Sequence, residues 1–199
     1  MSIDVVIVRT GIANLSSITA GLERAGGRVT VTEDPRVVRE AMRVMLPGVG
    51  AFKAGMDALN ASGMADALRE RIAEDRSTAG ICLGMQLLCA SSEESPGVAG
   101  LGIVPLPIGR FKGGNIRVPQ LGWNRVEAPD DARLLRSGYA YFANSYRLDQ
   151  EPKGWACAFA DHGGRFVAAM ERGNVLGCQF HPELSGEYGL ETLKRWLRL

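Results

Sequence analysis

The sequence is poor in the residues that build metal centres and disulfide frameworks. Its 199 residues include two histidines and four cysteines, and no two cysteines have the C-x-x-C spacing. Neither a zinc site nor a dithiol redox pair is therefore expected. Lysine and arginine (23) nearly balance aspartate and glutamate (22), which leaves a net charge of +1. Such a neutral chain gives no electrostatic reason to predict nucleic acid or an acidic membrane as a partner.

Long apolar runs are missing as well. No segment approaches the about 18 apolar residues of a membrane-spanning helix, and the first residues lack the basic and apolar regions of a secretory signal. Free thiols are typical of a reducing compartment, so we expect a cytoplasmic protein. Repeats and low-complexity tracts are absent, and hydrophobic residues make up 46% of the chain. Composition and length together favour one globular domain over residues 1–199.

The first half of the chain alternates β-strand and α-helix patterns. Apolar, β-rich runs predict strands over 3–8, 28–32, 44–46 and 78–81. Helical spacing or a helix start signal predicts helices over 14–25, from Asp34-Pro35 onward, over 52–60 and over 64–75. This order is typical of the α/β class, in which helices cover both faces of a mostly parallel sheet and ligands bind beyond the C-terminal strand ends.

The second half has a different pattern. Residues 109–180 are dense in glycine, aromatic residues and short β runs, which predicts partly antiparallel strands with turns at Gly113-Gly114 and Gly163-Gly164. Apolar positions in 187–199 predict a terminal helix.

Cys82 lies between Gly80 and Gly84 where the strand pattern over 78–81 gives way to a predicted helix over 83–90. This G-x-C-x-G pattern is the cysteine counterpart of the nucleophile elbow of serine hydrolases. So sharp a bend strains the central residue, and the glycines remove side chains two positions away that would collide with it. A sulfur at a helix start is favoured as thiolate, and the N–H groups there can receive an oxyanion. The alternative is that Cys82 is a small buried hydrophobic residue, as most free cysteines are.

A cysteine nucleophile needs a base, and the base needs an orienting group. His181 and Glu183 stand two residues apart, and on an extended segment both would point to one face. Pro182 favours that extended conformation at His181. The other histidine, His162, lies in a D-H-G-G segment that predicts a solvated turn.

The glycine loop at 47–50 has two of the three glycines of a dinucleotide fingerprint and lacks the G-K-[ST] of a phosphate loop. No cofactor is therefore predicted. Taken alone, the loop is also compatible with a plain tight turn.

Several segments together resemble one family. They are G-I-C-L-G-M-Q at 80–86, F-H-P-E at 180–183, L-P-G-V-G-A-F at 46–52, V-P-Q-L-G-W-N at 118–124 and S-Y at 145–146. The first two resemble the class I (triad) glutamine amidotransferases. The glycine loop and the G-W-N segment are similar to those of the glutaminase subunits of imidazole glycerol phosphate synthase, and the resemblance covers nearly the whole chain.

The resemblance implies a flavodoxin-like fold and a complete set of site residues. The implied catalytic triad is Cys82, His181 and Glu183. The implied oxyanion hole uses backbone N–H groups of Val49, Gly50 and Leu83, and glutamine would be bound by Gly48, Gln86, Asn144, Ser145 and Tyr146.

The resemblance also implies a partner. It is a (β/α)₈-barrel cyclase subunit, with which the chain would form a heterodimer that makes imidazole glycerol phosphate and aminoimidazole carboxamide ribotide in histidine biosynthesis. The alternatives are a glutaminase that serves a different ammonia acceptor, a binding subunit with a decayed site, and a cysteine peptidase or deglycase of similar architecture. The chain departs from the commonest family pattern at Arg9-Thr10, Gln120, Asn144 and Leu184. None of these positions is in the implied triad, and all lie in stretches that the family uses near its partner interface and the mouth of its active site.

Overall fold

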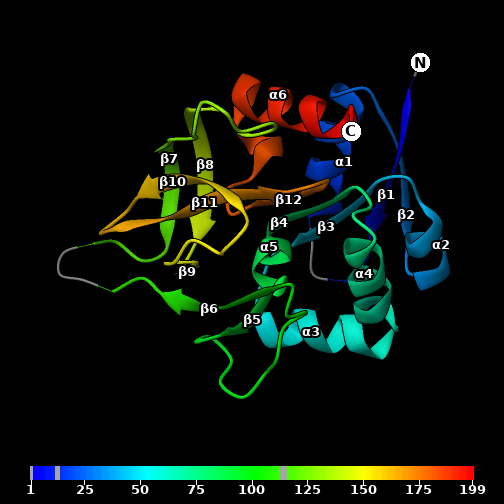
Figure 1. The fold of residues 1–199 in the computed structure, drawn as a ribbon, viewed down its shortest axis with the longest axis horizontal. Helices are drawn as coiled ribbons and strands as arrows, with labels where there is room; N and C mark the ends of the chain where they lie inside the picture. The colour runs from blue at the N-terminus through cyan, green and yellow to red at the C-terminus, as the bar shows by residue number, and fades with distance from the viewer. Residues whose placement is uncertain (1, 12–13, 113–115) are drawn as a thin grey trace.

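A computed structural model describes residues 2–11, 14–112 and 116–199. Its centre is a seven-stranded sheet with the order β10-β11-β12-β4-β3-β1-β2 (Figure 1). The four strands predicted in the first half are all present, as β1 (Ile3–Val8), β2 (Gly27–Thr32), β3 (Val44–Gly48) and β4 (Thr78–Cys82). These four strands and β12 (Val175–Cys178) run parallel to one another, so the predicted mostly parallel α/β sheet is confirmed.

Helices cover both faces of the sheet because successive side chains of each strand point to opposite sides. Met45 and Ile81 point into one hydrophobic cluster with α1 (Leu15–Arg24) and α6 (Gly186–Leu197). Val44 and Leu46 point into the other cluster, on the face covered by three helices. Those helices are α2 (Pro35–Glu40), α3 (Phe52–Ala61) and α4 (Met64–Ala73). The side chains of Asn14 and Asp34 accept hydrogen bonds from backbone N–H groups at the starts of α1 and α2, as N-cap residues do.

The second half supplies the antiparallel strands that the sequence predicted. Strand β11 (Arg165–Arg172) pairs antiparallel with β12, and β10 (Ala156–Asp161) pairs antiparallel with β11. The β10–β11 hairpin turns at the predicted Gly163-Gly164. Strands β7 (Gln120–Val126) and β8 (Gly138–Asn144) form a separate antiparallel hairpin, and a small sheet contains β5 (Cys89–Ser92), β6 (Val104–Arg110) and β9 (Tyr146–Arg147). The predicted turn at Gly113-Gly114 lies outside the described residues.

One predicted helix is much shorter than expected. The helix predicted over 83–90 ends at Leu87 as α5 (Leu83–Leu87), and Cys89–Ser92 forms β5 instead. Backbone N–H groups from a distant segment compete for the carbonyls here: Leu101 donates to Leu87 O at 2.8 Å and Gly100 to Ala90 O at 2.8 Å. Long-range pairing therefore overrides the helix propensity of these residues.

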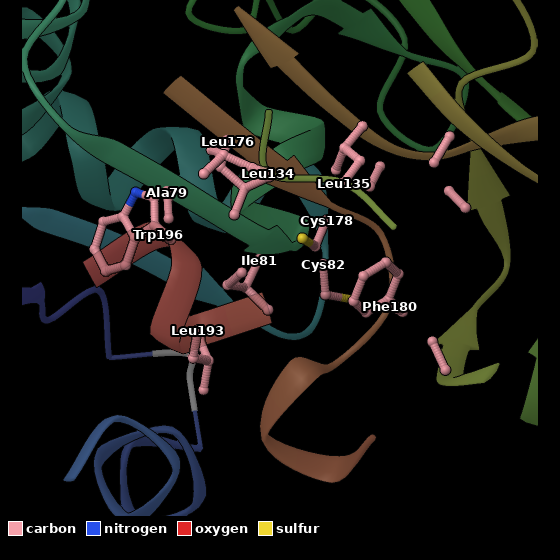
Figure 2. Packing of buried hydrophobic residues seen from close by; sticks show 14 of the residues in the cluster. Ala79, Ile81, Cys82, Leu134, Leu135, Leu176, Cys178, Phe180, Leu193 and Trp196 are labelled. Carbon is pink, nitrogen blue, oxygen red and sulfur yellow. The ribbon is translucent and has the colours of Figure 1, made fainter. Parts of the chain in front are cut away.

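Three segments that are far apart in the sequence meet at the C-terminal edge of the parallel strands. Gly48 at the end of β3 pairs with Cys82 at the end of β4, and Cys178 at the end of β12 pairs with Ile81. Figure 2 shows Cys82 at the tip of β4 close to Phe180, in the segment that continues from β12. The glycine loop, the cysteine turn and the segment that contains His181 thus lie together, as predicted. Among the described residues, no helix is long and apolar enough to cross a membrane.

Candidate active site

Cys82 occupies a sharp turn between β4 and α5. Its backbone has φ 54° and ψ −111°, which makes it one of two non-glycine residues with positive φ among the described residues. This conformation is uncommon for a residue that carries a side chain, and such residues cluster at functional sites. The strained strand-to-helix turn predicted from the G-x-C-x-G pattern is therefore confirmed.

The two flanking glycines are needed for a different reason from the one predicted. A Cβ on Gly80 would lie 2.8 Å from the carbonyl oxygen of Gly84, and a Cβ on Gly84 would lie 1.8 Å from the carbonyl oxygen of Leu46. Neither contact involves Cys82. The glycines let the turn fold back on itself and let α5 approach β3 closely, and this packing holds the nucleophile turn in place.

His181 and Glu183 form a buried pair. The imidazole Nδ1 lies 2.9 Å from Glu183 Oε1, and the two side chains are 9% and 6% exposed. His181 has the predicted extended backbone, but Glu183 lies in a short 3₁₀-helix, η1 (Pro182–Leu184), so the prediction of one continuous extended segment is wrong. The 3₁₀-turn brings the Glu183 carboxylate back to the imidazole of His181.

The surroundings of His181 raise its pKa. Burial of the imidazole acts to lower the pKa, but interactions with the Cys82 thiol and with the Glu183 carboxylate outweigh it and raise the pKa above the usual range of histidine. The environment therefore favours a proton on the ring, between a sulfur and a carboxylate, so a neutral His181 can take the proton of a thiol, hold it as imidazolium and deliver it later.

The thiol and the imidazole open onto the same cavity of about 280 Å³, which we call the thiol pocket. Every residue predicted for the site lines it, except Gly48 and Glu183. The predicted oxyanion residues Val49, Gly50 and Leu83 therefore lie at one cavity with the predicted substrate residues Gln86, Asn144, Ser145 and Tyr146. Among the described residues, neither the Val49 nor the Gly50 N–H donates to another backbone group.

Gly48 and Glu183 lie at a second cavity of about 280 Å³, the rear pocket. Val49, Ala143 and His181 line both cavities, so the two cavities adjoin at these residues. Leu184, which is 45% exposed, lies at the rear pocket. The predicted substrate role of Gly48 thus has no support from the thiol pocket. A Cβ at Gly48 would instead lie 3.0 Å from Cβ of Leu83, so this glycine permits close packing against α5.

His162 is a turn residue, as predicted, but it is not fully solvated. Its Nε2 lies 2.8 Å from Arg117 O, and its ring packs edge-on against Phe111 at 5.1 Å between centroids. It lies at neither pocket, so among the described residues His181 is the histidine that faces Cys82.

Two residues at the site were missed by the sequence analysis. Glu94 lines the thiol pocket, and its Oε2 accepts the Phe52 N–H at 2.7 Å. Gln179 is fully buried, and its Nε2 lies 3.7 Å from Cys82 Sγ. The adjacent acids Glu93 and Glu94 look alike in the sequence, so nothing marked one of them for the pocket. Gln179 could have been singled out, because it directly precedes the F-H-P-E segment.

The other cysteines are unsuited to nucleophilic chemistry. Burial raises the pKa of Cys89 to about 12, and burial together with the charge of Glu151 raises that of Cys157 to about 12. Burial raises the pKa of Cys178 as well. Among the described residues, no group of three or more His, Cys, Asp or Glu side chains is placed to hold a metal ion.

Fold and site together define a class: α/β proteins that carry a cysteine on a strand-to-helix turn beside a histidine–carboxylate pair. Comparison with protein families agrees, because residues 7–198 match the family described as "Glutamine amidotransferase class-I". Solved structures share the fold at low identity. One described as a glutamine amidotransferase has a TM-score of 0.78 at 20% identity and covers 98% of this chain and 99% of that one. PurLQS from Thermotoga maritima has a TM-score of 0.76 at 16% identity, with 100% and 99% covered.

Curated relatives narrow the family. "Imidazole glycerol phosphate synthase subunit HisH" of Symbiobacterium thermophilum is 41% identical, over 98% of this chain and 93% of the relative. The Bacillus subtilis subunit of the same name is 38% identical, over 97% and 95%. "Imidazole glycerol phosphate synthase hisHF, chloroplastic" of Arabidopsis thaliana is 42% identical, over 97% of this chain, which spans 34% of that longer relative. The chain therefore belongs to the class I glutamine amidotransferases, in the family of the HisH subunits.

Proposed function

We propose that the chain hydrolyses glutamine to glutamate and ammonia with Cys82, His181 and Glu183, and passes the ammonia to the cyclase subunit of an imidazole glycerol phosphate synthase. The observation that carries this proposal is the shared cavity. The thiol of Cys82 and the imidazole of His181 face one pocket, and Glu183 Oε1 lies 2.9 Å from His181 Nδ1. The names of the relatives, which describe subunits of imidazole glycerol phosphate synthase, support this choice of partner.

The proposal implies the following covalent steps. His181 takes the proton of the Cys82 thiol, and the sulfur attacks the side-chain carbonyl carbon of glutamine. Backbone N–H groups of the Val49–Gly50 loop and of Leu83 receive the negative oxygen. The imidazolium, stabilised by Glu183, gives its proton to the departing ammonia. Water, deprotonated by His181, then cleaves the thioester and releases glutamate.

Glu94 gives the pocket a preference for an amino acid. Glutamine carries a positive ammonium at the end opposite its reacting amide, and Glu94 is the acidic residue among those that line the thiol pocket. We infer that this carboxylate binds the ammonium while Gln86, Asn144, Ser145 and Tyr146 surround the rest of the substrate. The Glu94 side chain is pre-positioned, because one of its oxygens already accepts the Phe52 N–H.

The partner is proposed to dock beside the rear pocket. In the β7–β8 hairpin, alternate residues point to opposite faces, and Trp123 pairs with Tyr141. One face is buried in the core through Val126, Ala140 and Phe142. The other face, which we call the hairpin face, presents Leu121, Trp123, Tyr139 and Tyr141, of which the first three are 64%, 58% and 61% exposed.

The hairpin face is close to the catalytic turn. A Cβ at Gly186 would lie 3.7 Å from the Trp123 ring, and Gly186 stands two residues after Leu184. Exposed aromatic residues are typical anchors of protein interfaces. A cyclase bound there as a heterodimer would cover the rear pocket and receive ammonia on the far side of His181 from the glutamine. The chemistry needs no cofactor, and the four free buried cysteines fit a reducing compartment such as the cytoplasm.

The reaction is tested by measuring glutamate formation from glutamine in the presence of the cyclase and its nucleotide ligand. Cys82→Ala should abolish turnover. Glu94→Gln should raise KM by about 10- to 100-fold with a smaller effect on kcat, since a hydrogen bond to a charged group is worth about 1.5–3 kcal/mol. The matched control is Glu93→Gln, because Glu93 pairs with Lys112 at 2.7 Å and does not line the pocket. Equal KM values for the two variants would contradict the role of Glu94.

The docking surface is tested by affinity for the cyclase. Trp123→Ala should weaken binding by at least about 30-fold, because truncating a central aromatic anchor costs about 2 kcal/mol or more. Met42→Ala is the control, since Met42 is 71% exposed but precedes β3 at the opposite end of the sheet. A Trp123→Ala variant that binds the cyclase like the unmodified chain would exclude the hairpin face. Ammonia transfer to another acceptor enzyme, and none to the cyclase, would overturn the partner assignment.

A further inference from the structure

The nucleophile has a second neighbour besides His181, a carboxamide with no role in the chemistry proposed above. Gln179 follows β12, its side chain is fully buried, and its Nε2 lies 3.7 Å from Cys82 Sγ. Its backbone is fixed as well, since the Gln179 N–H donates to Ala168 O at 2.8 Å. The amide thus belongs to a rigid part of the sheet and is held beside the sulfur.

The orientation of this amide is set by a backbone group that can only accept. The carbonyl oxygen of Tyr146 lies 3.2 Å from one end of the Gln86 amide, which must therefore be the donating nitrogen. The same Gln86 nitrogen lies 2.8 Å from the Gln179 amide, so the atom that accepts this hydrogen bond must be the Gln179 oxygen. The nitrogen of Gln179 is then left to face Cys82. The chain Tyr146–Gln86–Gln179–Cys82 allows no flipped assignment that keeps these hydrogen bonds.

We propose that Gln179 is a positioning residue for the nucleophile: its carboxamide donates to the Cys82 sulfur, stabilises the thiolate and keeps the sulfur turned toward His181 and the thiol pocket. A thiolate accepts hydrogen bonds and cannot donate them, so a fixed N–H donor favours the thiolate over the thiol. Because the carboxamide of Gln179 does not titrate, its N–H remains a hydrogen-bond donor at every pH at which the enzyme works.

Gln86 links the Gln179–Cys82 contact to the proposed substrate site. Gln86 lines the thiol pocket and holds the oxygen of Gln179, so the residue that surrounds glutamine also fixes the residue that faces the sulfur. The inference rests on the nucleophilic role proposed for Cys82. Its test, however, uses alkylation of the thiol and needs no glutamine turnover, so it can fail or succeed separately from the proposed function.

The test variant is Gln179→Met, since methionine has a similar length and no N–H. The measured quantity is the rate of alkylation of Cys82 by iodoacetamide as a function of pH, followed by peptide mass mapping. We expect the pH of half-maximal rate to rise by about one unit, because a hydrogen bond to a charged group is worth roughly 1.5 kcal/mol at the weak end. In turnover with the cyclase, kcat should fall about tenfold while KM changes less, since Gln86 keeps its bond to Tyr146.

Gln120→Met is the matched control. Gln120 is also a buried glutamine, at 5% exposed, and its side chain has no hydrogen bond to Cys82 or His181 among the described residues. Its alkylation profile should match that of the unmodified chain. A Gln179→Met variant that folds with an unchanged alkylation profile would overturn the proposal.

A measurement on the unmodified chain covers the case in which Gln179→Met does not fold. The side-chain amide signals of Gln179 in a ¹H–¹⁵N NMR spectrum should shift with pH at the midpoint of the alkylation profile. The shift at that midpoint should vanish in Cys82→Ser. Gln179 amide signals that do not respond to the ionisation of Cys82 would refute the contact.

Discussion

Glu183→Gln separates the orienting role of the carboxylate from its packing role. Glutamine has nearly the same shape, so the 3₁₀-turn that carries residue 183 should persist. The change removes a negative charge 2.9 Å from His181 Nδ1, in a pair whose side chains are 9% and 6% exposed. It also lets the ring be held in the wrong tautomer, since an amide nitrogen can donate to Nδ1 where a carboxylate can only accept.

The expected loss can be worked from these two effects. An opposite charge at this distance shifts a pKa by about 1–3 units, so removing it costs the imidazolium about 1.4–4 kcal/mol, or 10- to 1000-fold in rate. A wrong tautomer adds to this, and in a serine protease triad the equivalent change costs about 10⁴ in kcat. We therefore expect kcat to fall between 10- and 10⁴-fold while KM for glutamine stays nearly constant.

The pH dependence of stability gives a second readout. The folded-state pKa of His181 is raised, so its ion pair stabilises the fold fully below the unfolded pKa of histidine and loses this effect as the pH rises through the raised value. The difference in unfolding free energy between the unmodified chain and Glu183→Gln should accordingly be largest near pH 6 and shrink at high pH. Urea denaturation over a pH series measures it.

Glu187→Gln is the control for both measurements, because Glu187 is an exposed acid in the first turn of α6. A Glu183→Gln enzyme with turnover near that of the unmodified chain would show that His181 needs no orienting carboxylate, and that Cys82 and His181 suffice.

Three further predictions follow from the site and the core. A diazo-ketone analogue of glutamine, or iodoacetamide at pH 8, should label Cys82 and spare the three cysteines whose pKa values are raised by burial; a label on Cys178 would refute the assignment. The isolated chain should turn over glutamine about 10²–10³ times more slowly than the complex with ligand-bound cyclase, because one misaligned oxyanion donor in the 47–50 loop costs that much; equal rates at saturating glutamine would exclude gating. Arg71→Met should lower the unfolding free energy by roughly 3 kcal/mol or more, since it strips hydrogen bonds from the carbonyls of Val38, Ala41 and Ser77; an unchanged urea midpoint would contradict this.

The parts of the fold that could be predicted are those set by local pattern. The strands that end at Gly48 and Cys82 consist of short apolar runs followed by glycine-rich turns, and both features are visible in the sequence alone. The residues of the proposed triad could also be singled out, because a cysteine between two glycines and a histidine two residues before a glutamate restrict the choices severely.

Features set by distant contacts were not predictable. The residues after Leu87 have helix propensity, and they form a strand only because residues 100–104 donate to their carbonyls. Glu94 enters the thiol pocket because its loop is anchored on Phe52 at the start of α3, a contact across 42 residues. Glu183 reaches His181 through a 3₁₀-turn that the extended interpretation of Pro182 did not foresee. In the first two cases the deciding partner lies outside the local window, and in the third the turn type was misjudged.

The pairing of β4 with β12 has a consequence for how the chain becomes an enzyme. Cys82 and its neighbour Gln179 are separated by 97 residues, yet they are brought together by adjacent strands at the centre of the sheet. On a ribosome that adds about 5–20 residues each second, the thiol of Cys82 emerges seconds before His181, the base of the proposed mechanism. By that mechanism, a nascent chain carries its nucleophile without the base needed to cleave glutamine. Hydrolysis would begin only after β12 has paired with β4, so the last strand of the sheet to be synthesised would also complete the catalytic site.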